Sequence, residues 1–214
     1  ARVNLDQDIN KMLTVGLSAS YAQNKYDNVP LGDKVDQNAG VLTAAIQANP
    51  STPVYDENGD YYIDPARSSI PNAVSLLEIK DNTVKDRIMA SAYALLKPLE
   101  GLELKAQLGA DRRGQKRNSY VPKSTLFGAN ENGIANIAQE SSTDYLMDLT
   151  ATYSKALGEH NLKALVGYSY QRFTGNSVRA GNSDFIIDGF EYNNLSAGAN
   201  PKPTVGSGAW LNCL

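Results

Sequence analysis

Apolar and polar residues alternate along six stretches of this chain, and the stretches come in pairs joined by short turns. In the clearest pair, the odd-numbered residues from Tyr145 to Tyr153 are apolar, and so are the even-numbered residues from Leu162 to Tyr170. A period of two residues is typical of a β-strand whose two faces meet different surroundings. The pair therefore predicts an antiparallel hairpin with its turn at residues 154–160.

Two further pairs follow the same plan, one over residues 3–21 and one over residues 87–110. Pro98 fits the turn of the second pair, because proline cannot donate a hydrogen bond to a sheet. The strand at 87–96 is the least regular, since Tyr93 points away from most of its apolar neighbours. We expect six strands arranged as three hairpins.

The hairpins are separated by long stretches at residues 24–85 and 118–143, and another long stretch follows residue 174. These stretches are rich in Asn, Gly, Ser, Pro and Asp, the residues of turns and loops. Short turns at one end and long loops at the other are typical of outer-membrane barrels, as are tyrosines at the ends of apolar strand faces. A soluble antiparallel sheet also alternates, so the strands alone leave both possibilities open. The combination favours an all-β fold, an antiparallel up-and-down transmembrane β-barrel segment of about six strands with long extracellular loops.

Composition adds limits to this interpretation. The chain has 214 residues, of which 42% are hydrophobic, and a formal net charge of −3. It has no run of about 20 apolar residues, as a transmembrane helix requires, while its mean hydropathy of −0.38 is compatible with barrel strands. The densest basic cluster, at residues 112–117, indicates either the solvated end of a strand or a contact with an anionic ligand or lipopolysaccharide at the outer rim. We expect no nucleic-acid partner, and the single cysteine, Cys213, excludes a disulfide framework within the chain.

Two groups of residues invite a catalytic or metal-binding interpretation, and both have a simpler one. His160 is the only histidine and lies in a turn, whereas a zinc site needs further His or Cys ligands. Residues 56–60 are acidic, but they lack the alternating ligands and the distal Glu of a calcium loop, and an Asn-Gly hairpin turn explains them. We predict no catalytic residue, no metal and no cofactor.

Aromatic residues in the long loops are the candidates for ligand contact. Such side chains stack on sugar rings or pack against a partner protein; the alternative is cross-strand packing within a small hairpin. Residues 40–47 predict a short loop helix whose apolar face covers the barrel or contacts a neighbour. The candidate contact residues are Tyr55, Tyr61, Tyr62, Phe185, Phe190 and Tyr192.

Five phrases of the sequence carry a resemblance to a known family. Together and in this order they resemble the starch-utilisation-system C (SusC, RagA-like) type of TonB-linked outer-membrane transporter of Bacteroidetes. The resemblance covers residues 1 to about 205, so we expect 1–205 to be part of the barrel domain and 206–214 to be an atypical, truncated tail. The chain also opens in the middle of a strand, which is expected of an internal piece of a larger protein. The phrases lie at residues 4–16, 48–59 with its Pro-Val-Tyr-Asp-Glu-Asn-Gly sequence, 72–77, 96–102 and 158–168.

The resemblance implies a function in transport. The parent protein would import a glycan or a peptide through the bacterial outer membrane, together with a surface lipoprotein of the SusD type. TonB would supply energy through parts that this chain does not contain, and outer-membrane lipid would surround the barrel. Members resemble barrels of about 22 strands, so six strands would form about a quarter of the wall. Two alternatives remain open, a soluble β-sandwich carbohydrate-binding module and a β-rich hydrolase with paired carboxylates.

Overall fold

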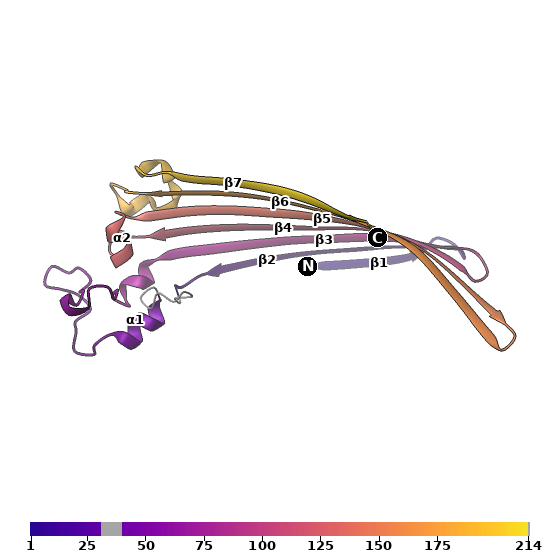
Figure 1. Ribbon diagram of the computed structural model, residues 1–214, viewed down its shortest axis with the longest axis horizontal. Coiled ribbons are helices and arrows are strands. Elements are labelled where there is room, and N and C mark those ends of the chain that lie inside the picture. Colours follow the sequence, from indigo (N-terminus) through magenta and orange to yellow (C-terminus); the bar gives the residue numbers. More distant parts are fainter. Residues whose placement is uncertain (31–39, 214) are drawn as a thin grey trace.

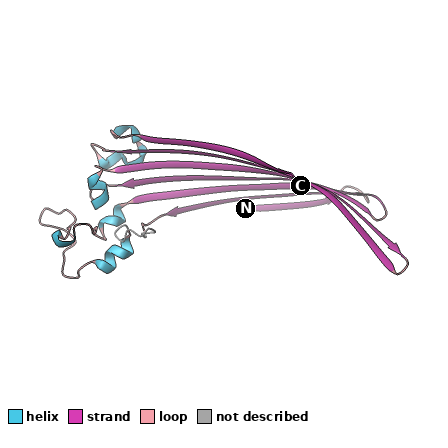
Figure 2. Cartoon of the chain, in the orientation of Figure 1, coloured by secondary structure: helices cyan, strands magenta, loops and turns pink. Residues whose placement is uncertain are grey.

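The computed structural model describes residues 1–30 and 40–213, and most of them form one antiparallel sheet (Figure 1, Figure 2). Seven strands pair in the order β1-β2-β3-β4-β5-β6-β7, so each strand hydrogen-bonds to its neighbours in the sequence. This arrangement is an up-and-down meander that leaves β1 and β7 at open edges. The predicted all-β, antiparallel, up-and-down fold is confirmed. The strands are β1 (Arg2–Asp8), β2 (Leu13–Asp27), β3 (Lys80–Leu99), β4 (Leu102–Val121), β5 (Ile134–Leu157), β6 (His160–Ser183) and β7 (Lys202–Cys213).

Short helices gather at one end of the sheet, where the long connections lie (Figure 2). The predicted loop helix is present as α1, and no described helix has the length and hydropathy needed to cross a membrane. At the opposite end, tight turns join β1 to β2, β3 to β4 and β5 to β6 (Figure 1). The predicted asymmetry of short turns and long loops is therefore confirmed. The helices are α1 (Val41–Gln47) and α2 (Leu126–Asn130), with 3-10 turns at Pro65–Arg67, Ser75–Glu78, Asp188–Asn193 and Leu195–Ala197.

One of the tight turns depends on a glycine. Gly101, in the turn between β3 and β4, has a φ of +82°, a region that strains any residue with a side chain. A Cβ atom at Gly101 would lie 2.2 Å from the carbonyl oxygen of Ser154. The turn therefore requires glycine both for its backbone conformation and for its close approach to β5.

The strands extend further toward the long loops than the alternation predicts. The strand expected to start near Arg87 begins at Lys80, and β5 and β6 have 24 residues each. The stretch after residue 174, expected to be loop, instead completes β6 and forms the additional strand β7. The reason is physical: where both faces of a sheet meet water, the backbone ladder continues but the apolar–polar alternation disappears. The tail expected at 206–214 lies, through residue 213, within β7.

The register places apolar side chains of neighbouring strands on one face. Directly paired residues of antiparallel strands point to the same side of the sheet, so paired positions form continuous rows. The opposite face carries mostly polar rows, which confirms the alternation seen in the sequence. The central apolar row is Leu17, Ala92, Leu108, Met147 and Tyr170, and the row next to it on the polar face is Gly16, Tyr93, Gln107, Asp148 and Ser169.

Buried hydrophobic residues lie under the loops rather than along the sheet. Tyr120, Ala135 and Phe185 form a small cluster at the loop end, and Leu76 is buried in the first long loop. In contrast, Leu17 and Leu108 in the central apolar row are 50% and 58% exposed. The apolar face thus has no protein covering it within the described residues. An exposed apolar surface of this extent requires an apolar medium or a partner.

Candidate functional site

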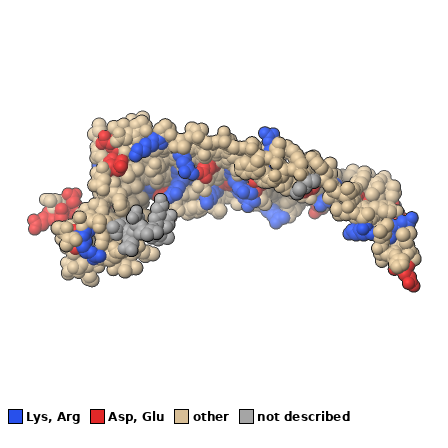
Figure 3. All heavy atoms as spheres, viewed as in Figure 1, with Lys and Arg blue, Asp and Glu red and all other residues tan. Residues whose placement is uncertain are grey.

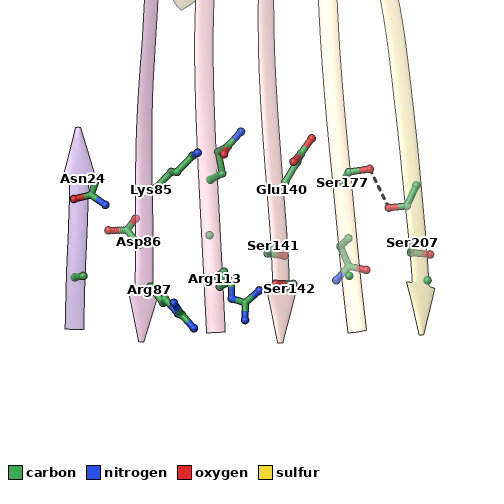
Figure 4. Close-up of a pocket in the computed structure, with 17 residues that line it drawn as sticks. Asn24, Lys85, Asp86, Arg87, Arg113, Glu140, Ser141, Ser142, Ser177 and Ser207 are labelled. Carbon is green, nitrogen blue, oxygen red and sulfur yellow. Dashed lines mark hydrogen bonds between the residues drawn. The ribbon is translucent and has the colours of Figure 1, made fainter. Parts of the chain in front are cut away.

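The polar face of the sheet contains a groove of about 800 Å³ that crosses strands β2 to β7 (Figure 4). Lys85, Arg113 and Glu140 line it from three adjacent strands (Figure 4). The hollow forms because small residues follow in the same row: Arg113 pairs with Ser142, Ser142 with Gly175, and Gly175 with Gly208. The floor of the groove is therefore largely backbone on β6 and β7, flanked by charged side chains on β3, β4 and β5.

Ion pairs fix the charged side chains of this face. Asp111 accepts two hydrogen bonds from Arg87, at 3.0 Å from Nε and 2.7 Å from Nη2. The same carboxylate lies 2.5 Å from Nη2 of Arg113, which also approaches Asp144 at 3.4 Å. In the space-filling view, basic and acidic side chains lie next to one another along the strands (Figure 3). A carboxylate shared between two arginines holds both guanidinium groups in place at the rim of the groove.

Further pairs continue this pattern toward the loops. Nη2 of Arg179 lies 2.6 Å from Oε1 of Glu140, and Arg117 forms an ion pair with Asp81. The arginines involved are about half exposed, so each pair contributes little to stability. What the pairs provide is a surface of fixed hydrogen-bond donors and acceptors in a wide, open groove. Such a surface can bind or guide a polar solute. Within the described ranges, no three His, Cys, Asp or Glu side chains are placed to hold a metal ion.

The acidic segment at 56–60 is a hairpin turn. Tyr55 and Tyr61 form an isolated antiparallel bridge, and their ring centroids lie 5.2 Å apart with a tilt of 33°. The Asp56 carboxylate accepts hydrogen bonds from the backbone N–H groups of Asn58, at 2.8 Å, and Asp60, at 3.0 Å. The acidic side chain is therefore used within the turn, as the Asn-Gly hairpin interpretation predicted.

The tyrosines of the first long loop differ in their exposure and in their hydrogen bonds. Tyr55 is 52% exposed, whereas the hydroxyl of Tyr61 donates to Oε1 of Glu78 at 2.7 Å. This hydrogen bond to Glu78 raises the pKa of Tyr61 well above its usual value. Tyr62 is half-buried and donates its backbone N–H to Val54 at 3.0 Å. Of the three, Tyr55 presents the ring face most available to a ligand or partner.

The aromatic residues of the last loop also separate into packing and exposed positions. Phe185 is fully buried and packs edge-on against Tyr120, with ring centroids 6.0 Å apart. A side chain without exposed surface cannot contact a ligand, so the expected ligand contact at Phe185 is corrected to a packing role. Tyr192 is half-buried beside this cluster and donates to Oδ1 of Asn82 at 3.2 Å. Phe190 is 49% exposed.

The six aromatic candidates do not form one site. The first loop, with α1, and the last loop, before β7, lie at different sides of the loop end (Figure 1). The loops are nevertheless tied to the sheet and to each other: Ser124 and Tyr61 both donate to Glu78, and Glu191 forms an ion pair with Lys80. Together they form a connected rim rather than independent flaps.

The groove residues were missed by sequence reasoning, although part of the signal was visible. The basic cluster at residues 112–117 does not form one patch, because alternation divides it between the two faces. Arg113 and Arg117 point to the polar face, where they pair with carboxylates, whereas Arg112 and Lys116 point to the apolar side. Placing Glu140 opposite these residues needs the register of β4 and β5, which the sequence does not state.

No family model matches the chain. The sequence is 31% identical over 199 residues to TonB-dependent receptor P3 of Formosa agariphila, an alignment that covers 92% of this chain and 20% of that protein. It is 25% identical over 211 residues to TonB-dependent receptor P26 of the same organism, covering 95% of this chain and 20% of that protein. The chain thus spans about a fifth of the length of these curated relatives.

Solved structures show the same fold. The RagAB peptide transporter matches with a TM-score of 0.75 and 23% identity, covering 99% of this chain and 25% of that chain. The RagAB peptide importer in its closed-closed state matches with a TM-score of 0.71 and 24% identity, covering 98% of this chain and 24% of that chain. The whole described sheet, with its loops, therefore corresponds to about a quarter of a longer chain in those structures.

Proposed function

We propose that this segment of a TonB-dependent receptor forms part of the barrel wall of an outer-membrane nutrient importer. The observation that carries the proposal is the continuous apolar row from Leu17 to Tyr170, which crosses five strands on one face while the other face is polar. A barrel wall between lipid and a polar lumen needs this arrangement. The proposal places the protein in the bacterial outer membrane and assigns residues 1–205, with the rest of β7, to the barrel domain.

Energetics support the assignment of the apolar face to lipid. Complete burial of a Leu or Val side chain contributes about 1.5–3 kcal/mol, so leaving Leu17, Leu108 and Val166 in water would be costly. In a bilayer every backbone N–H and C=O group must be paired within the protein. The ladders from β1 to β7 meet this requirement, and further strands of the parent barrel would pair with the open edges.

The polar groove would then face the lumen and line the path of the nutrient. Fixed arginine and carboxylate groups suit a solute that carries both kinds of charge or many hydroxyl groups, so a peptide and a glycan are the two substrate classes we propose. Tyr55 and Phe190, exposed at the loop end, are our proposed contacts for substrate or partner. The structural neighbours are described as peptide transporters, and the curated relatives as receptors; none of them is described as an enzyme.

The loops also offer a surface for a protein partner. Ile46 of α1 is 85% exposed and Ile186 of the last loop is 88% exposed. Burying such side chains against another protein is favourable, so these two positions support contact with a protein partner. We propose a surface lipoprotein of the SusD type as this partner, and contact with TonB through other parts of the parent protein. A soluble β-sandwich is not favoured, because no second described sheet packs against the apolar face.

Two matched arginine substitutions in the parent receptor test the wall assignment. Leu108→Arg places a charge near the middle of the apolar face, which costs about 2–4 kcal/mol at the bilayer midplane. Gln107→Arg, its neighbour on β4, adds the same charge to the polar face. We expect Leu108→Arg to reduce the amount of folded receptor in the outer membrane and Gln107→Arg to leave it unchanged. Equal tolerance of both substitutions would overturn the proposal.

A further inference from the structure

Two arginines lie on the apolar side of the sheet, directly beyond the unbroken series of apolar positions, toward the loops. On β4 this series ends at Ala110 and continues with Arg112, and on β6 it ends at Tyr170 and continues with Arg172. Tyr145 of β5 lies between these strands, because it pairs with Ala110 on one side and with Arg172 on the other. The boundary of the apolar face is therefore marked by two cations with a tyrosine between them.

These two arginines differ from those of the polar face. Arg87, Arg113 and Arg179 each have a carboxylate within 2.7 Å, and Arg117 pairs with Asp81. Arg112 and Arg172 are exposed, and within residues 1–30 and 40–213 neither forms an ion pair. An anion from outside the described chain is the natural counterpart of such a pair of guanidinium groups.

The carboxylate of Asp86 lies on the apolar side of the sheet in the same region, and it already accepts hydrogen bonds from other residues. Its Oδ1 accepts hydrogen bonds from the hydroxyl of Tyr21 at 3.1 Å and from Nε2 of Gln23 at 2.7 Å. Both partners come from β2, on the side of β3 away from Arg112. Asp86 therefore does not neutralise the arginine in this structure.

Two lysines extend the cationic surface toward the loops. Lys116 lies on the same side of β4 as Arg112, and it pairs with Val84 of β3. Lys25 of β2 pairs with Val84 from the other side, so both lysines point outward in one row. Both are exposed and, within the part of the chain that the structure describes, neither forms an ion pair.

We propose that Arg112 and Arg172 bind the phosphate groups of the glycolipid in the outer leaflet of the outer membrane. The inference rests on the proposed function, because it requires the apolar face to lie in lipid with the loops outside. At that depth a guanidinium group meets lipid phosphate, to which it donates two parallel hydrogen bonds. Tyr145 lies where an amphipathic ring favours the interface between hydrocarbon and headgroups. Lys25 and Lys116 would attract anionic groups above the first phosphate layer.

Native mass spectrometry of the parent receptor, titrated with diphosphorylated lipid A, tests this inference. The variant Arg112→Gln/Arg172→Gln removes two outward charges next to the apolar boundary. We expect its affinity for diphosphorylated lipid A to fall about thirtyfold, since each of the two cations contributes about 1 kcal/mol near an anionic membrane surface. The variant Arg112→Lys/Arg172→Lys keeps the charges, and its affinity should lie between that of the unmodified receptor and that of the glutamine variant. Unchanged affinity of the glutamine variant would overturn the inference.

A matched control removes two charges at the opposite end of the barrel. Lys155 and Lys163 are exposed residues beside the turn between β5 and β6. The variant Lys155→Gln/Lys163→Gln should bind diphosphorylated lipid A as the unmodified receptor does; an equal loss would show a non-specific charge effect and overturn the inference. Titration with phosphatidylglycerol distinguishes the sources, because an equal loss of its binding in the arginine variant would overturn the assignment to the glycolipid.

The folded state of each variant in the outer membrane is measured separately, as the difference in gel mobility between heated and unheated samples. If all variants insert and fold but the lipid effect is missing, the phosphate inference fails and the barrel assignment stands. If the unmodified receptor does not insert into membranes at all, the proposed function fails first.

Discussion

The hydroxyl of Tyr93 on β3 donates a hydrogen bond to Oδ1 of Asp6 on β1, at 2.8 Å, across the strand that separates them. The bond is possible because Gly16 of β2 lies under the ring: a Cβ atom there would be 2.1 Å from Cε1 of Tyr93. Three strands are thus joined on the polar face by one tyrosine, one glycine and one carboxylate. The same contact explains why Tyr93 broke the apolar alternation of its strand.

Replacing Gly16 with valine should destabilise the barrel. The new side chain would occupy the space of the Tyr93 ring and force it off Asp6, and overpacking of this kind costs about 1–3 kcal/mol. The free energy of unfolding of the parent receptor in urea measures the effect. Tyr93→Phe is the control: it removes the hydrogen bond alone, for which we expect a smaller loss of about 1 kcal/mol. A Gly16→Val variant as stable as the unmodified receptor would contradict the packing described here.

Alanine substitutions at three glycines distinguish the cost of backbone strain from the cost of steric contact. Gly101→Ala should be the most destabilising, since it combines a φ of +82° with a clash against Ser154. Gly158→Ala has a φ of +63° but open space around the new methyl group, so we expect a loss of about 1 kcal/mol from strain alone. Gly114→Ala has neither problem and should be neutral. Urea unfolding of the three variants checks this order, and any other ranking of Gly101 and Gly114 would refute it.

Asp111→Asn should change the selectivity of the groove more than its stability. The substitution leaves Arg87 and Arg113 without their shared carboxylate, in positions where both arginines are about half exposed. Coulomb attraction over several ångströms in a wet groove then favours an anionic peptide over a neutral one by about threefold. Binding of two peptides of equal length and different charge to the parent receptor measures the ratio.

Asp86→Asn provides the matched control for that experiment: Asp86 lies on a strand that lines the groove, but its carboxylate bonds to Tyr21 and Gln23 on the opposite side of the sheet. It removes the same charge but should leave the peptide ratio unchanged. A similar shift in both variants would mean that the groove is not the surface that selects the substrate.

Tyr61 should ionise only at a pH well above the usual tyrosine value of about 10. The hydrogen bond to Glu78 stabilises the neutral phenol, and the negative charge of that carboxylate opposes a phenolate. Since the pKa is raised in the folded state, the stabilisation is present below pH 10 and is lost as pH rises through the folded pKa. Absorbance at the phenolate band, compared with Tyr61→Phe, isolates this titration, and Glu78→Gln should move it down. A Tyr61 titration at the ordinary value would show that the bond to Glu78 is not formed in solution.

The alternation in the sequence predicts the parts of the strands where one face meets lipid, and it does not predict the parts beyond them. Residues 145–153 and 162–170 alternate because Leu149 and Val166 must face hydrocarbon while Asp148 and Gly167 face the lumen. Above the membrane both faces are wet, so the continuation of β6 to Ser183 and the start of β3 at Lys80 leave no such pattern. Burial of Phe185 was equally hidden, since it depends on Tyr120, which is distant in the sequence.

The groove could not be predicted from the sequence for a related reason. Arg113, Glu140 and Gly175 come from three strands, and they line one hollow only because the register brings their rows together. The tyrosine hairpin of the first loop was predictable, because Asn58 and Gly59 form a local turn. Contacts within one turn could be predicted from the sequence, whereas contacts between strands could not.

Accessibility of cysteines along β4 distinguishes a barrel wall from a sheet that meets water on both faces. In the parent receptor with all its native cysteines replaced by serine, including Cys213, single cysteines are introduced at positions 104 to 109. Intact outer membranes are then treated with a water-soluble maleimide. We expect alternating reactivity: the positions of Lys105, Gln107 and Gly109 react from the lumen, and those of Leu104, Ala106 and Leu108 are protected by lipid. Uniform labelling of all six positions, or labelling of the apolar set instead, would contradict a barrel wall in this orientation.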